Sequence, residues 1–202
     1  MTFPTCARML AVVSCLNLHL AHAQAAPTGM PPLPALGTPG PDFDARQWAI
    51  GYRAANAAQS VVEYVLPVET VDTWRELLTH QSMKFPGRPV SLAALVEQAK
   101  AELGQGCPSL RWQMLSQSDT EAVYQWSDGG CGGSPPQFEI ARLRRLDAGF
   151  CRWAYASKRL PLPAAIQEAL KPEVEKLACD RSRRRILLHR RDARPIGADK
   201  GR

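Results

Sequence analysis

Four cysteines between Cys107 and Cys179 constrain the fold of this chain more than any other feature of its sequence. Between them, apolar and polar residues alternate in short runs that are separated by Gly, Pro, Asp and Ser, and a helical pattern follows the last run. Such alternation predicts strands with one buried face. An even number of cysteines in an exported protein favours disulfides over free thiols.

Residues 1–26 have the pattern of a secretory signal peptide, which removes Cys6 and Cys15 and leaves these four cysteines. Arg8 is followed by a short apolar stretch and then by alanines that suit a cleavage site. The stretch is shorter than the roughly 20 residues that span a bilayer. We therefore expect a periplasmic or secreted protein. The alternative is an outer-envelope lipoprotein anchored at Cys15.

The remaining chain divides by composition into three parts. Residues 27–41 hold six prolines and predict an extended Pro-rich linker. Residues 42–179 predict one α+β domain, and residues 180–202 predict a basic C-terminal tail. The tail has nine Arg or Lys against three Asp, which accounts for the whole net charge of +6. The domain itself therefore has no basic excess that would indicate nucleic-acid binding.

The periodicity of the domain predicts a single antiparallel sheet of about six to seven strands with two main helices. An Ala-rich helix over Ala45–Gln59 is an alternative for the first strand. Ser91 is expected to cap the first helix and Gly104 to end it. The expected strands cover residues 48–53, 60–66, 74–83, 110–114, 122–126, 138–146 and 150–157, and the expected helices cover residues 92–103 and 164–179.

Hairpin register predicts a disulfide between Cys107 and Cys131. If the turn at 117–120 centres between Ser118 and Asp119, Cys107 faces residue 130, one residue from Cys131. A disulfide requires Cα atoms about 4.4–6.8 Å apart, and this register nearly supplies that distance.

Matched lengths predict the second disulfide, between Cys151 and Cys179. The strand that follows Cys151 runs about 25 Å, and a helix over Ala164–Cys179 returns about 24 Å. Pro172 interrupts this helix, either as a kink or as the start of a second segment.

Catalytic motifs are absent from the sequence. After signal cleavage only His80 and His189 remain, and we expect His80 to be a sheet residue. Cys131 lies in a Gly-rich loop that lacks a nearby helix start or basic residues, so a structural role is favoured over a reactive thiol. No cofactor or metal is indicated. An acid/base pair drawn from Glu63, Glu69, Asp72 and Glu76 is the alternative that would make the protein an envelope enzyme.

The aromatic residues and the basic tail each allow two interpretations. Most of the tryptophans and tyrosines lie on expected strands, where core packing is favoured over a ligand-stacking face. The tail is either a solvated end or a weak contact for anionic lipid headgroups or an acidic partner.

The sequence from Val61 to Pro67, with Glu69 to Gln81, is similar to a pattern in small exported proteobacterial proteins of unassigned role. The order of the expected elements resembles the PsbP-like fold, which a photosystem subunit, a nuclear-import factor and bacterial envelope lipoproteins share. That fold is associated with binding and assembly more than with catalysis. The resemblance implies a non-enzymatic module that binds an envelope protein or another surface partner.

Overall fold

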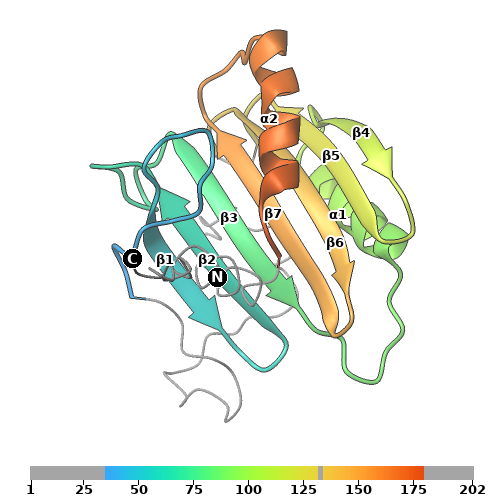
Figure 1. Cartoon of the computed structure of the whole chain (residues 1–202). Coiled ribbons are helices and arrows are strands. Elements are labelled where there is room, and N and C mark those ends of the chain that lie inside the picture. Colours follow the sequence, from blue (N-terminus) through green and yellow to red (C-terminus); the bar gives the residue numbers. More distant parts are fainter. Residues whose placement is uncertain (1–34, 132–133, 180–202) are drawn as a thin grey trace, which may run out of the picture.

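A single antiparallel sheet forms the centre of the molecule (Figure 1). The computed structural model describes residues 35–131 and 134–179. The predicted signal peptide, the predicted tail and most of the predicted linker lie outside the described residues. The sheet order is β1-β2-β3-β7-β6-β5-β4, and this confirms the fold class that the periodicity predicts. The strands are β1 (Ala49–Ala55), β2 (Gln59–Val65), β3 (Glu76–Met83), β4 (Arg111–Gln117), β5 (Glu121–Asp128), β6 (Gln137–Leu146) and β7 (Gly149–Ser157).

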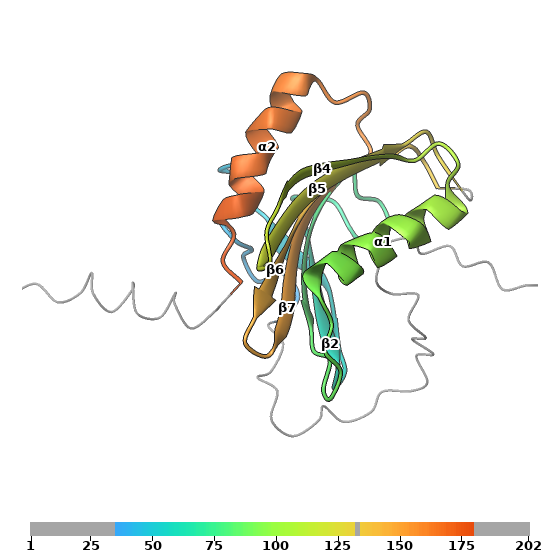
Figure 2. The ribbon, with the colours of Figure 1, turned by 90° about the vertical axis from the view of Figure 1, so that its right-hand side faces the viewer.

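Two helices lie on opposite faces of the curved sheet (Figure 2). Helix α1 (Leu92–Gly106) begins after Ser91, whose hydroxyl accepts a hydrogen bond from the backbone N–H of Ala94 at 3.1 Å. It ends two residues later than Gly104, the predicted end, because the N–H of Cys107 bonds to the Gly104 carbonyl. Helix α2 (Ala164–Lys176) ends three residues before the predicted Cys179, and Pro172 lies inside this one helix.

Apolar side chains fill both sides of the sheet. The cluster on the α2 side contains Ile140, Trp153 and Val174, and the cluster on the α1 side contains Leu92, Tyr124 and Ala154. Successive residues of a strand point to opposite faces. A central strand between two covered faces therefore buries its residues on both sides, and β7 is buried from Phe150 to Ser157.

The register of the β4–β5 hairpin corrects one detail of the disulfide prediction. The turn centres between Asp119 and Thr120, one residue later than predicted, because the N–H of Ser118 bonds to the Glu121 carbonyl. A bulge between Met114 and Ser116 then shifts the pairing, so that Trp112 faces Trp126. Extended to the open end of the hairpin, this register sets Cys107 opposite Cys131. The two residues form the predicted disulfide, with Cα atoms 5.2 Å apart.

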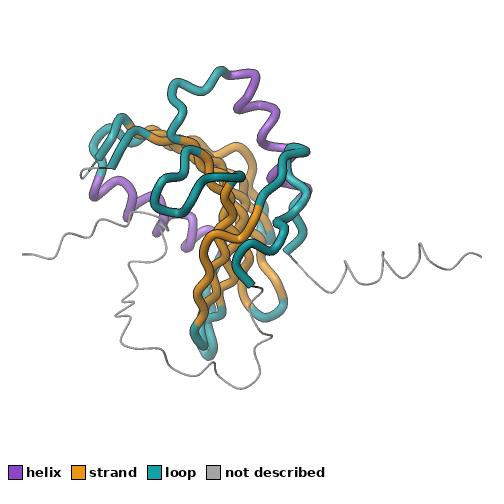
Figure 3. Tube along the Cα trace, turned by 90° about the vertical axis from the view of Figure 1, so that its left-hand side faces the viewer, coloured by secondary structure: helices purple, strands orange, loops and turns teal. Residues whose placement is uncertain are grey.

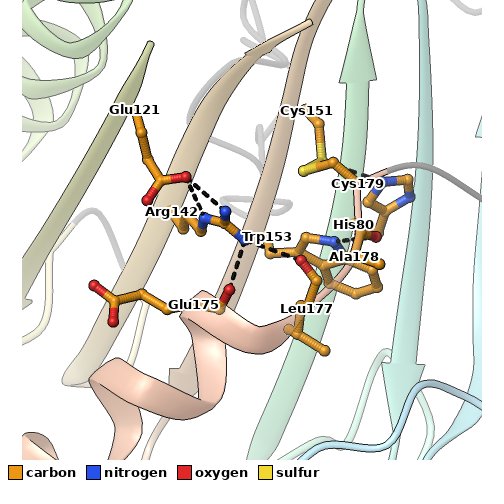
Figure 4. The surroundings of a disulfide bond; sticks show 9 residues. All are labelled: His80, Glu121, Arg142, Cys151, Trp153, Glu175, Leu177, Ala178 and Cys179. Carbon is orange, nitrogen blue, oxygen red and sulfur yellow. Dashed lines mark hydrogen bonds and ion pairs between the residues drawn. A yellow bond between two sulfur atoms is a disulfide. The ribbon is translucent and has the colours of Figure 1, made fainter. Parts of the chain in front are cut away.

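Three contacts fasten the C-terminal end of α2 to the sheet (Figure 4). Cys179 forms the predicted disulfide with Cys151 of β7. The indole N–H of Trp153 donates to the Ala178 carbonyl at 3.2 Å. Arg142 of β6 donates through Nη1 to the carbonyls of Glu175 and Leu177, at 2.8 and 3.0 Å.

Arg142 acts as a cap for α2, because the last carbonyls of a helix have no partner within it. Its Nε and Nη2 both donate to Oε2 of Glu121 on β5, at 2.9 and 2.6 Å. One guanidinium thus joins β5, β6 and the end of α2.

The two edges of the sheet differ. Residues 37–40, from the stretch predicted as linker, run along the outer side of β1, the edge that Figure 3 faces. There the N–H of Gly37 donates to the Ile50 carbonyl at 2.8 Å, and the N–H of Ile50 donates to the Thr38 carbonyl at 3.0 Å. The alternative helix over Ala45–Gln59 is wrong, because β1 pairs with β2 there. At the opposite edge, no strand among the described residues pairs with the outer side of β4.

Replacing Gly149 by alanine is expected to lower the free energy of unfolding by about 2–3 kcal/mol. Gly149 has φ of 142°, a region that side chains disfavour, and a Cβ there would lie 2.0 Å from the Met83 carbonyl oxygen. The hairpin tip would therefore have to move away from β3. Urea unfolding of Gly149→Ala checks this, with Gly104→Ala as control, because a Cβ at Gly104 meets open space. Equal stability of the two variants would contradict the close approach of β7 to β3.

Candidate functional site

Four carboxylates were the candidates for acid/base chemistry, and ion pairs at the start of β3 involve Glu69 and Glu76. The Glu76 carboxylate pairs with Arg46 and with Arg159. Glu69 accepts from the side chain of Arg75 at 3.1 Å and from its backbone N–H at 3.2 Å. These contacts tie the start of β3 to its neighbouring segments.

The other two carboxylates lie in different surroundings. Asp72 is exposed in the turn before β3, and Glu63 is buried in the middle of β2, where it faces Thr79. None of the four carboxylates lines the hollow at the start of β4 or the hollow beside the β6–β7 turn.

His80 is a buried residue of β3, and the sequence predicts it to be a sheet residue. It is 7% exposed, and its ring lies 4.4 Å from the ring of Trp153. Its Nε2 is 3.5 Å from the Cys151 sulfur (Figure 4). Because that sulfur is bonded to Cys179, it offers no thiolate for nucleophilic chemistry.

Cys131 also belongs to a disulfide. Cys107, Asp128 and Cys131 bring one ligand atom each within 4.8 Å of one another, which is a spacing that suits a metal ion. The two sulfurs are bonded to each other, however, and a metal binds thiolates. In the oxidised protein, Asp128 is therefore the one member of this group that could still bind a metal ion.

Core packing accounts for most of the aromatic residues. Trp48, Tyr64, Trp74, Tyr124, Trp126, Trp153 and Tyr155 are buried, and Tyr52 and Trp112 are partly exposed. Trp112 on the edge strand stacks on Tyr124 with ring centroids 4.5 Å apart. A stack of two rings on neighbouring strands stabilises the hairpin.

A hollow of about 1140 Å³ lies at the end of the sheet where β4 begins and α2 begins. Helix α2 packs mainly on β6 and β7, so it leaves the α2-side face of β4 and β5 uncovered. That uncovered face supplies the floor of the hollow, with Gln113, Gln125 and Ser127. The wall comes from Leu160, Pro161 and Leu162, which connect β7 to α2, and from Gln167 of α2.

The lining of the hollow combines apolar groups with amides. The Gln125 amide donates to Oε1 of Gln113 at 2.8 Å, and the Gln167 amide donates to the Leu162 carbonyl at 2.8 Å. Burial raises the pKa of the Asp128 carboxyl at one end, although hydrogen bonds from the backbone N–H groups of Gly130 and Gln137 oppose that rise. Few fixed charges and several amides suit a ligand that carries both peptide-like polar groups and apolar groups.

The hollow adjoins the unpaired edge of the sheet. Six consecutive residues, Pro108–Gln113, line it, and the last three of them form the start of β4. The outer N–H and C=O groups of β4 are therefore next to a recess that accepts side chains. An exposed edge strand is a template for pairing with another extended chain.

A buried ionic network on the α1 side was not predicted from the sequence. Arg152 of β7 is 3% exposed and donates to Oε1 of Glu139 at 2.5 Å and to the Tyr124 hydroxyl at 3.2 Å. The Trp126 indole donates to the same Glu139 oxygen at 2.9 Å. Gln81 faces Arg152 from β3, and its Oε1 has no hydrogen-bond partner among the described residues.

Arg152 keeps its charge although it is buried. Burial opposes the charge on Arg152, but Glu139 and Tyr124 outweigh that cost and hold the pKa of the guanidinium above its ordinary value. Burial also raises the pKa of the Tyr124 hydroxyl. A buried pair that is satisfied by several hydrogen bonds fixes the mutual position of three strands.

No protein-family model, curated protein sequence or solved structure matches this chain. Neither α1 nor α2, the two helices of the described part, is long and apolar enough to cross a membrane. The two disulfides are consistent with an oxidising compartment outside the cytoplasm.

Proposed function

We propose that this is an exported, non-enzymatic binding protein that holds an extended segment of an envelope protein partner at the β4 edge. The hollow between the β4–β5 face and the start of α2 is the single observation that carries this proposal. Its volume of about 1140 Å³ has room for several side chains, and the open strand beside it supplies backbone hydrogen bonds. Recognition by strand addition uses these two elements together.

Other features support the same proposal. The signal-peptide pattern and the two disulfides agree with export. The order of elements that resembles the PsbP-like fold is associated with binding and assembly. The four candidate carboxylates lie outside both hollows, so the alternative of an acidic active site has less support.

A peptide-display selection on the purified full-length protein tests the proposal. We expect extended peptides with alternating apolar residues to be enriched and to bind with Kd values of about 1–100 μM, which is typical of transient peptide recognition. Gln125→Trp, which fills the floor of the hollow, should weaken this binding at least tenfold. Fluorescence anisotropy with a labelled peptide measures the effect.

Lys100→Trp is the matched control, because Lys100 is exposed on α1, on the other face of the sheet. It should leave peptide affinity unchanged. The proposal fails if no peptide is enriched, or if Gln125→Trp and Lys100→Trp bind the selected peptides equally well.

A further inference from the structure

A second hollow, of about 810 Å³, lies at the opposite end of the sheet. Three connections meet there, at the lower end of the sheet in Figure 1: the β1–β2 turn, the β3–α1 segment and the β6–β7 turn. They contribute Ala57, residues 84–86 and 88–91, and residues 145–150 to its lining.

Cations without carboxylate partners gather at this end. Lys84, Arg88 and Arg145 line the hollow, and Arg144 is adjacent in β6. All four are exposed, and none forms an ion pair with a described residue. Asp147 is the one acidic residue in the lining. Ion pairs elsewhere in the described fold engage Arg46, Arg75, Arg142, Arg152, Arg159, Lys171 and Lys176.

Apolar groups lie among these cations. Phe85 and Val90 are partly exposed, Pro86 and Pro89 are exposed, and all four line the hollow. The Arg145 guanidinium lies 5.9 Å from the centre of the Phe150 ring. Basic residues mixed with an aromatic and other apolar residues suit the boundary between lipid headgroups and acyl chains.

The basic C-terminal stretch begins at the same end of the molecule. Arg144 faces Cys151 across the β6–β7 hairpin, and Cys151 is bonded to Cys179. Residues 180–202, with nine Arg or Lys, follow directly. Cys179, the last described residue before this basic stretch, therefore lies at the end of the sheet that carries the exposed cations.

We propose that this end of the fold docks on an anionic phospholipid surface, with a lipid phosphate in the hollow between Lys84, Arg88 and Arg145. Phe85 and Val90 then rest at the headgroup level. The opposite end, with the β4 edge, points away from the membrane and is free to hold a protein partner. A cation near an anionic bilayer strengthens binding by roughly fivefold, and the attraction weakens as salt is added.

Sedimentation of the full-length protein with vesicles of phosphatidylcholine and about 30% phosphatidylglycerol tests the proposal. We expect binding at low salt, with little binding to pure phosphatidylcholine vesicles. The double variant Arg88→Gln/Arg145→Gln should weaken partitioning roughly 25-fold, since it removes two cations. Both side chains are exposed, so the fold should tolerate the change.

Lys100→Gln/Arg111→Gln is the matched control for vesicle binding, because it removes the same charge from two exposed residues that lie away from this hollow and form no ion pair with a described residue. It should change partitioning less than threefold. Equal effects of the two double variants would overturn the proposal. It would also be overturned if deletion of residues 181–202 abolished binding while Arg88→Gln/Arg145→Gln left it unchanged. Titration with inorganic phosphate distinguishes a site for lipid phosphate from a site for free phosphate. Binding of inorganic phosphate without binding to vesicles would contradict the proposal.

Discussion

Replacing Arg152 by methionine is expected to lower the free energy of unfolding by about 3–5 kcal/mol. The change leaves the Glu139 carboxylate buried with the Trp126 indole as its remaining side-chain donor, and it removes the donor to the Tyr124 hydroxyl. An unpaired buried charge costs far more than the net value of the pair that held it. Urea unfolding at pH 7, followed by tryptophan fluorescence, measures the loss.

The double variant Arg152→Met/Glu139→Gln is expected to be more stable than Arg152→Met alone. It removes both charges, and the Gln carbonyl oxygen keeps an acceptor for Trp126. We expect the double variant to lie within about 1.5 kcal/mol of the natural protein, which gives a large coupling energy between the two sites. A loss that is simply the sum of the two single losses would contradict a direct pair.

Local sequence rules predict the strands because the decisive information is local. Alternation in Leu110–Met114 and in Ala122–Trp126, with turn residues between them, identifies a hairpin without knowledge of the rest of the chain. The register at the open end was one residue off because the turn lies one residue later than predicted, and the bulge between Met114 and Ser116 offsets half of the resulting shift. The alternation of side chains reveals neither irregularity. The cysteines nevertheless gave the correct pairing, because a disulfide tolerates a range of Cα separations.

The same local rules do not predict the buried network of Arg152, Glu139 and Tyr124. Glu139 and Arg152 alternate with apolar neighbours, so a period of two assigns them to the solvent side of a half-buried strand. The assignment fails because α1 and α2 cover both faces of β6 and β7. The residues next to Glu139 or Arg152 in the sequence do not indicate that the two form a pair, since they are 13 positions apart in the chain.

The two hollows depend on tertiary placement in the same way. The hollow beside β4 exists because α2 packs mainly on β6 and β7 and leaves β4 and β5 uncovered. The hollow lined by Lys84, Arg88 and Arg145 exists because three connections that are far apart in the sequence meet at one end of the sheet. The net charge of the sequence lies in the tail, and the neutral composition of the domain does not show how its own charges are distributed over the folded surface.

The two disulfides are expected to stabilise the fold by similar amounts, about 3.5 kcal/mol each. The linked cysteines are 24 and 28 residues apart, and loop-closure entropy depends only weakly on such a difference. Cys107→Ala/Cys131→Ala should therefore lose about 3.5 kcal/mol in urea unfolding. Loss of both bridges, about 7 kcal/mol, would use up much of the 5–15 kcal/mol margin of an ordinary domain. We expect the variant without cysteines at these four positions to be largely unfolded at 37 °C.

A difference between the stability losses of the two double variants would show how much each disulfide contributes to packing in the folded state. Cys151 is fully buried, so Cys151→Ala/Cys179→Ala also loses packing at that sulfur and should cost about 1 kcal/mol more. Helix α2 should still dock in that variant, because Arg142 and Trp153 hold its last carbonyls without the sulfur atoms. Retention of α2 is visible as unchanged hydrogen exchange at Leu170 and Val174, two buried residues of the helix. If α2 detached instead, the disulfide and not the guanidinium cap would be what fixes the helix to the sheet.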